Sequence, residues 1–263
     1  MVDDSTIRIL ESQILTRLCR DRPRIVVGVA GAQGSGKSTL ACQLRDRIVA
    51  TGIQSVVLSL DDFYLSHADR VLLSKFQHPL LLTRGVPGTH DMHLLEATVD
   101  RLLKSNGTVE WPKFSKAKDD REGFHWFDVS DVTQGLVVIL EGWCVGCVPQ
   151  ADVDTPVNDL ERFDDPDVHW RRFVQDSIRN IYLPVWSKLD MYIFLQVPDW
   201  DSVARWRTEQ AVGNCENLSD LNIGRFVQFF ERITKQMIHD RWKTDVVVTL
   251  NQDHSVATIV CEH

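Results

Sequence analysis

The sequence predicts an α/β fold in which helices cover both faces of a parallel sheet, and three observations support this. Five short apolar runs alternate with stretches of helical periodicity. The interiors of these runs are continuously apolar, as is typical of strands buried on both faces. No linker divides the 263 residues, so we expect a single domain over residues 1–263.

The predicted elements follow from local patterns along the chain. Apolar residues at helical spacing predict a first helix over 5–20, and the five apolar runs predict strands at 25–30, 55–60, 135–140, 191–197 and 245–250. Further helices are predicted at 39–50, 92–103, 168–187, 201–211 and 225–239. Asp91 is a candidate cap for the helix that starts at Met92.

Two stretches lack a regular pattern. Prolines and glycines between residues 79 and 88 predict irregular structure over 61–90. Residues 104–135 mix polar, basic and aromatic side chains, which indicates a loop or hairpin region. We therefore expect an acceptor-binding insertion over 63–134 within the single domain.

Charge and cysteine content restrict the class of protein. The sequence has 29 Lys and Arg against 37 Asp and Glu, and this net charge of −8 argues against binding nucleic acid or an anionic membrane through bulk charge. We find no apolar stretch long enough to span a bilayer and no secretory signal pattern. Six cysteines are too few for a disulfide scaffold, so a cytoplasmic protein with reduced thiols is expected. The oligomeric state stays open.

A phosphate-binding loop follows the first predicted strand. Residues 31–39 read Gly-Ala-Gln-Gly-Ser-Gly-Lys-Ser-Thr, which matches G-x-x-x-x-G-K-[ST] between a strand and a helix. Glycines allow several backbone N–H groups to face one phosphate, and the helix amino terminus adds positive potential. We expect Lys37 to reach the outer phosphates and Ser38 to ligate Mg²⁺. The predicted nucleotide-binding residues are Gly31, Gln33, Gly34, Ser35, Gly36, Lys37, Ser38 and Thr39.

Carboxylates end the second and third predicted strands. Asp61 and Asp62 follow 55–60, and Glu141 closes 135–140. At the carboxyl end of a parallel strand such groups face the ligand crevice. A carboxylate there orients an acceptor hydroxyl and takes its proton, or holds Mg²⁺ directly or through water. The same residue types also end strands and cap turns for structural reasons, which is the alternative.

Several segments together resemble the phosphoribulokinase/uridine kinase group of P-loop kinases, and more closely its D-glycerate 3-kinase-like branch. The resemblance runs over nearly the whole chain after residue 25. It rests on the segments 30–39, 59–64, 84–91, 112–116, 140–144, 206–210 and 218–237. The strings Arg-Gly-Val-Pro-Gly-Thr-His-Asp at 84–91 and Trp-Arg-Thr-Glu-Gln at 206–210 are more specific than the phosphate loop.

The resemblance implies a P-loop kinase core with a roughly five-stranded parallel sheet, together with ATP and Mg²⁺ as cofactors. It assigns the acceptor-activating carboxylate to Asp61, with Asp62 beside it, and the acidic strand end to Glu141. It also assigns a lid arginine to Arg207, within a lid region at 199–224. Lys37, Asp61 and Arg207 are therefore the expected catalytic residues.

The acceptor side needs fixed cations if the acceptor is a small anion. Gly85 and Gly88 frame Arg84 in a tight loop that could present its guanidinium. For each basic candidate a solvated surface position is the alternative. The predicted acceptor-binding residues are Asp62, Tyr64, Arg84, His90, Lys116 and Arg121.

The sequence thus predicts an ATP-dependent kinase that transfers the γ-phosphate to a hydroxyl of a small anionic metabolite, with D-glycerate as the leading acceptor. Two other functions stay open. One is a nucleoside or pantothenate-type kinase, and the other is a nucleotide-binding regulatory protein of the same fold. Neither the acceptor nor the choice between ATP and GTP follows from the residues alone.

Overall fold

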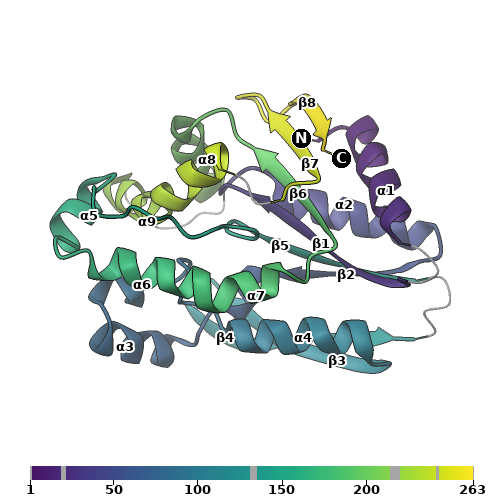
Figure 1. The fold of residues 1–263 in the computed structure, drawn as a ribbon, viewed down its shortest axis with the longest axis horizontal. Helices are drawn as coiled ribbons and strands as arrows, with labels where there is room; N and C mark the ends of the chain where they lie inside the picture. The colour runs from purple at the N-terminus through teal and green to yellow at the C-terminus, as the bar shows by residue number, and fades with distance from the viewer. Residues whose placement is uncertain (1, 19–21, 131–134, 214–219, 241–242, 263) are drawn as a thin grey trace.

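The computed structural model describes residues 2–18, 22–130, 135–213, 220–240 and 243–262, and its centre is a six-stranded sheet (Figure 1). The strands are β1 (Arg24–Gly31), β2 (Gln54–Ser59), β5 (Leu136–Gly142), β6 (Met191–Gln196), β7 (Val246–Leu250) and β8 (Val256–Cys261). Their order across the sheet is β2-β5-β1-β6-β7-β8. The first five are parallel, which confirms the predicted fold class, and β8 pairs antiparallel with β7 at one edge.

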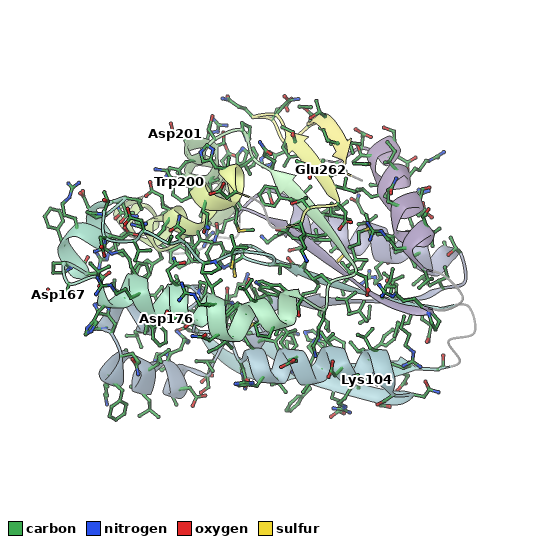
Figure 2. All side chains as sticks on the ribbon, viewed as in Figure 1. Lys104, Asp167, Asp176, Trp200, Asp201 and Glu262 are labelled. Carbon is green, nitrogen blue, oxygen red and sulfur yellow. The ribbon has the colours of Figure 1, made fainter. Side chains whose placement is uncertain are left out.

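Helices cover both faces of this sheet (Figure 1). On one face α1 (Asp4–Arg17) and α2 (Lys37–Ala50) pack against Ile25, Val27 and Val29 of β1. On the other face lie α4 (Met92–Lys104), α6 (His169–Ser177) and α9 (Asp220–His239), which pack with the alternate side chains of the same strand. Lys104 of α4 and Asp176 of α6 are exposed residues of this second layer, and both are labelled in Figure 2.

The remaining elements are short or lie near the sheet edges. They are α3 (His67–Phe76), α5 (Asp159–Asp164), α7 (Leu183–Trp186), α8 (Trp200–Gly213) and the single turns η1 (Leu60–Phe63), η2 (Pro79–Leu82) and η3 (Ile178–Tyr182). The helix predicted over 168–187 is present as the consecutive segments α6, η3 and α7. Asp91 caps α4 as predicted, because its carboxylate accepts a hydrogen bond of 3.1 Å from the Leu94 N–H.

Two predictions of local structure are wrong. Residues 61–90 are not irregular throughout, since they contain α3, whose amino end is capped by Ser66. This helix buries Arg70 but leaves Leu72 and Phe76 exposed, so it lacks the apolar stripe that reveals a helix in a sequence. Strand β8 is a further element absent from the prediction, although its sequence, Val-Ala-Thr-Ile-Val-Cys, is largely apolar; it is a partly exposed edge strand that pairs antiparallel with β7, outside the parallel pattern on which the prediction rests.

The region predicted as a loop or hairpin is an antiparallel hairpin, β3 (Gly107–Ser115) and β4 (Asp120–Val129), which forms a sheet of its own. It lies beside α4, at the border of the molecule away from β8 (Figure 1). Trp111 and Phe114 of β3 are buried against the body of the domain. The hairpin turn, residues 116–119, is thereby held at the carboxyl end of β2.

None of the helices in the described part of the chain combines the length and the apolar content that a bilayer span requires.

Candidate active site

The phosphate-binding loop lies between β1 and α2, in the strand–loop–helix setting that its sequence predicts. Gly36 caps α2 in a left-handed conformation, with φ of +85°. Gly34 also has a positive φ, of +79°, and a Cβ added there would lie 2.8 Å from the Cβ of Trp206. Both the backbone conformation and the close approach of α8 therefore require glycine at position 34.

Glu141 and Ser38 form a small oxygen-rich corner beside this loop. The parallel register places Ser59 of β2 next to Glu141 of β5, and the Ser59 hydroxyl donates to Glu141 Oε1 at 2.7 Å. The Ser38 hydroxyl donates to the same oxygen at 3.1 Å. Glu141 is only 5% exposed, and its Oε2 is buried without a hydrogen-bond partner.

This corner fits a hydrated divalent cation. Burial raises the pKa of Glu141, and the nearby Lys37 ammonium opposes that rise. A buried carboxylate oxygen without a partner normally costs free energy unless a ligand satisfies it. Hydroxyl and carboxylate oxygens are the ligands that Mg²⁺ prefers. Ser38 and Glu141 are therefore the residues that would hold Mg²⁺.

Asp61 faces this corner from η1, directly after β2. The Tyr64 hydroxyl donates to Asp61 Oδ1 at 2.7 Å, and Lys116 Nζ lies 2.6 Å from Oδ2. Burial alone would raise the pKa of Asp61, but Lys116, Lys37 and the Tyr64 hydroxyl outweigh it and lower the pKa to about 2. Asp61 is therefore ionised at neutral pH and can accept a hydrogen bond from a hydroxyl.

One cavity of about 150 Å³ joins these groups. It is lined by Gln33, Gly34, Lys37, Ser38, Asp61, Tyr64, Arg84, Lys116, Glu141, Trp143, Arg207, Phe226 and Phe230. The structure thus brings together all three predicted catalytic residues and both predicted metal ligands. It also brings Tyr64, Arg84 and Lys116 of the predicted acceptor-binding set to the same space.

Sequence reasoning missed the aromatic wall of this cavity. Trp143 Nε1 donates to the Gly85 carbonyl at 2.8 Å, and its ring meets Phe230 edge-on at 5.0 Å. Phe226 and Phe230 are four residues apart on α9, so they lie on the same face of that helix. The i, i+4 aromatic pair was the available signal, but nothing in the sequence shows that this face points to the cavity.

Arg84 is held over the cavity by two groups of the β3–β4 hairpin. Its guanidinium lies 5.6 Å from the centre of the Phe114 ring and pairs with Asp119 in the hairpin turn. The next residue, Gly85, has φ of +117°, and a Cβ there would lie 2.7 Å from the Phe230 ring. A glycine is therefore required beside Arg84 for the chain to pass this close to α9.

Three predicted acceptor-binding residues do not line the cavity. Asp62 accepts a hydrogen bond of 3.1 Å from the Phe114 N–H and lies 3.3 Å from His125 Nε2, so it holds the hairpin. Arg121 Nε donates to the Tyr64 carbonyl at 2.9 Å. His90 is 5% exposed, and burial lowers its pKa to about 4, so it is neutral at pH 7.

Asp62, Arg121 and His90 lie outside the cavity lining and hold Tyr64 or the hairpin beside it in place. The His90 ring packs 4.8 Å from the ring of Tyr64, and its Nδ1 lies 2.7 Å from the Tyr182 hydroxyl. The second guanidinium nitrogen of Arg121 lies 3.1 Å from Asp91. Residue type suggested contact with an anion, but the direction of each side chain is set by the packing of the hairpin, which the sequence does not reveal.

The structure describes only part of the predicted lid region, 199–224, because residues 214–219 lie outside the described residues. Arg207, on α8, lines the cavity, and its guanidinium lies 5.5 Å from the centre of the Phe226 ring. Arg205 instead points to the β7–β8 turn, where it donates to the Gln252 carbonyl. Only Arg207 of this pair reaches the cavity.

A second cavity, of about 390 Å³, lies on the other side of the phosphate loop. Its lining includes Thr39 and Gln43 of α2 and His254 of the β7–β8 turn. The His254 ring stacks on Trp206 at 4.0 Å, which ties that turn to α8. Predicted nucleotide-binding residues therefore lie on both cavities.

Cys144 and Cys147, which are spaced as C-x-x-C, are fully buried in the core beside β5. Among the described residues, no group of three or more His, Cys, Asp or Glu side chains is arranged to hold a metal ion.

The known proteins that are similar to this chain in sequence include two named as kinases. The chain matches no protein-family model. It is 32% identical over 224 residues, which are 80% of this chain and 76% of the relative, to the protein named uncharacterized kinase mug58 of Schizosaccharomyces pombe. It is 28% identical over 223 residues to the chloroplastic D-glycerate 3-kinase of Arabidopsis thaliana, covering 79% of this chain but 46% of that protein.

A solved structure supports the same fold. A D-glycerate 3-kinase from Cryptococcus neoformans superposes with a TM-score of 0.76 at 23% identity, covering 99% of this chain and 100% of that one. At this level of identity the likeness concerns the fold alone, and it confirms the predicted P-loop α/β core.

Proposed function

Because the chain belongs to the D-glycerate 3-kinase-like family of P-loop kinases, we propose that it transfers the γ-phosphate of ATP to a hydroxyl of D-glycerate. The observation that carries the proposal is the single small cavity in which the phosphate loop and Glu141 face Asp61, Lys116 and Arg84. Groups for holding the donor and groups for activating an anionic acceptor meet there.

On the donor side, Lys37 and the loop N–H groups bind the outer phosphates, while Ser38 and Glu141 hold Mg²⁺. When bound, Mg²⁺ supplies positive charge that neutralises the phosphate oxygens during transfer. The second cavity is continuous with loop residues Gly34 to Gly36 and with Thr39, so we assign the nucleoside part of ATP to it. Arg207 adds positive charge from the α8 side.

On the acceptor side, Lys116 occupies Asp61 Oδ2, the oxygen to which an acceptor hydroxyl would donate. The acceptor hydroxyl replaces Lys116 there, and the displaced ammonium is free to meet negative charge on the acceptor or on the transferring phosphate. With a pKa of about 2, Asp61 acts first by orienting the hydroxyl. Loss of the Lys116 contact raises the affinity of Asp61 for the proton that leaves the hydroxyl.

The transfer step requires no reacting group besides ATP, the acceptor hydroxyl and Asp61. The acceptor oxygen forms a bond to the γ-phosphorus, the bond from that phosphorus to the bridging oxygen breaks, and ADP leaves. Asp61 receives the hydroxyl proton late in this step, since little positive charge develops on the oxygen of a loose transition state.

The size and charge of the cavity favour a small anion. Its volume of about 150 Å³ is below the roughly 300 Å³ at which sites for drug-sized ligands begin. Arg84 and Lys116 supply two cations, and Trp143, Phe226 and Phe230 close the remaining wall. A three-carbon hydroxy acid matches these features better than a nucleoside does.

The test is an acceptor panel with the purified protein, ATP and Mg²⁺, in which ADP release and ³¹P NMR of the products are measured. The acceptors are D-glycerate, L-glycerate, glycerol, uridine and pantothenate. We expect D-glycerate to be the preferred acceptor. Preference for uridine or pantothenate would overturn the acceptor assignment, and ATP binding without transfer to any acceptor would point to a regulatory protein.

A further inference from the structure

Asp119 lies in the hairpin turn and contacts two guanidinium groups at once. Its Oδ1 pairs with Arg84, and its Oδ2 lies 2.9 Å from Nη2 of Arg70. The same Arg70 nitrogen donates to the Asp119 carbonyl at 2.6 Å. Asp119 has a left-handed backbone, with φ of +54°, so the turn adopts an uncommon conformation to present this carboxylate.

Arg70 is the fixed member of this group. It is 1% exposed on α3, and it also donates to the Leu82 carbonyl at 2.7 Å. Leu82 ends η2, two residues before Arg84. Arg70 therefore ties the hairpin turn to the segment that carries Arg84, and the relative position of Asp119 and Arg84 is determined by a buried anchor.

The charges of this group are unevenly placed with respect to the cavity. Asp119 pairs with both Arg70 and Arg84, with the His67 ring at 3.3 Å from the same Oδ2, and the neighbouring Asp120 carboxylate accepts a hydrogen bond from the His67 backbone N–H at 3.1 Å. Arg84 remains 25% exposed and lines the cavity, whereas Asp119 is not among the cavity-lining residues. A positive charge therefore remains on the cavity side of the group, where an anionic ligand would supply the second carboxylate.

We propose that Asp119 is a positioning residue that fixes the Arg84 guanidinium for the carboxylate of the acceptor, so that the hairpin turn sets the selectivity for anionic acceptors. This proposal rests on the proposed function for the identity of the acceptor. An unheld arginine side chain loses rotamer entropy when it becomes ordered. Asp119 orders Arg84 before the acceptor arrives, and the acceptor then binds a preorganised cation.

The first variant is Asp119→Asn. Asparagine keeps the shape and tolerates the left-handed backbone, but it lacks the charge that holds Arg84. We expect the KM for D-glycerate to rise about tenfold, with kcat and the KM for ATP within about twofold of wild type. The preference for D-glycerate over glycerol should fall by a similar factor. Glycerol has no carboxylate to contact Arg84, so its KM should not change.

The matched control is Glu122→Gln on the same hairpin. Glu122 pairs with Lys118, and neither residue lines the cavity. This variant removes the same charge from the same hairpin, and we expect wild-type constants. If Glu122→Gln changes the KM for D-glycerate as much as Asp119→Asn does, the effect is general electrostatics and the proposal is wrong.

The double variant tests whether Asp119 acts through Arg84. Asp119→Asn should add almost nothing to the effect of Arg84→Ala, because the group that it positions is gone. Additive losses, or an equal loss in kcat and in both KM values, would assign Asp119 a general structural role and overturn the proposal. If Asp119→Asn melts early, Asp119→Gly replaces it, since glycine removes the same carboxylate and adopts the left-handed backbone without strain.

The wild-type protein in the same assay separates the two levels of inference. If it phosphorylates D-glycerate and Asp119→Asn leaves the KM for D-glycerate unchanged, the role of Asp119 is wrong and the proposed function stands. If it prefers another anionic acceptor, the proposed acceptor is wrong, and the variants measured with that acceptor decide the role of Asp119. Preference for an uncharged acceptor overturns both.

Discussion

The proposed nucleotide side of the cavity and its proposed acceptor side differ in how their charged groups are paired. On the nucleotide side, Glu141 keeps a buried oxygen without a partner, which a ligand would satisfy. On the acceptor side, Asp61 is paired with Lys116 and Arg84 with Asp119. The nucleotide side is therefore ready for its ligand as folded, whereas on the acceptor side at least one protein ion pair must be exchanged for a contact with the ligand.

We expect the largest effect from a variant that disrupts the acceptor side alone. Asp61→Asn should lower kcat by about 10²–10⁴ while ATP binding stays nearly unchanged, because asparagine keeps the shape but cannot take the proton. Single-turnover transfer and nucleotide titration measure the two quantities. The control is Asp62→Asn, for which we expect a smaller loss in kcat and a lower melting temperature, since Asp62 holds the Phe114 N–H. If Asp62→Asn proves to be the less active enzyme, the base is assigned to the wrong residue.

We expect the next largest effect from a variant that disrupts the nucleotide side. Lys37→Ala should reduce kcat by about 10²–10³, the usual consequence of removing one group that stabilises the transferring charge. The side chain is only half-buried at the cavity, so the melting temperature should stay at the wild-type value. Steady-state kinetics and a thermal melt on one sample are sufficient. Retention of most activity would contradict the assignment of the phosphate loop.

A third variant sharpens the comparison by removing one of the protein ion pairs. In Lys116→Met, Asp61 is exposed to water, so acceptor-free ATP hydrolysis should rise about tenfold while transfer to D-glycerate falls. Lys118→Met on the same turn is the control, because Lys118 pairs with Glu122 and does not line the cavity. Unchanged hydrolysis in Lys116→Met would mean that the lysine does not shield the carboxylate.

The smallest effect concerns stability and pH. The pKa of Asp61 is about 2 in the folded protein against an ordinary 3.8, so its ionisation stabilises the fold above about pH 4, and this is lost as the pH falls towards 2. Asp61→Asn lacks this contribution. Between about pH 5 and pH 2, urea unfolding of wild type should lose about 2 kcal/mol more than that of the variant. Parallel losses in both proteins would show that Lys116 does not hold Asp61 ionised.

The two sides also differed in what the sequence could predict. The phosphate-loop motif occupies nine consecutive residues, 31–39, from the last residue of β1 to the first turn of α2, so local pattern alone located it. The acceptor side is assembled from η1, the segment around Arg84 and the hairpin turn, which lie far apart in the chain. Residue type identified Arg84 and Lys116 as candidates but equally selected His90 and Arg121, which the packing of Tyr64 turns away from the cavity.

The missed elements have the same physical origin. Helix α3 and strand β8 both lie at the periphery of the fold and are partly exposed: α3 leaves Leu72 and Phe76 exposed, and β8 is an apolar but antiparallel edge strand that the expected alternation of parallel strands and helices does not include. The burial of Arg70 also could not be predicted from the residues near it in the sequence. A buried arginine is rare, and this one is tolerated because its guanidinium donates to the carbonyls of Leu65, Leu82 and Asp119 and pairs with the Asp119 carboxylate.

The separate sheet of the β3–β4 hairpin has a consequence for protein engineering. Strand register in the central sheet fixes Ser59 beside Glu141, whereas the hairpin carries Lys116 and Asp119 on a unit with its own strand pairing. The length and sequence of this turn can therefore be redesigned without altering the register that sets Ser59 beside Glu141.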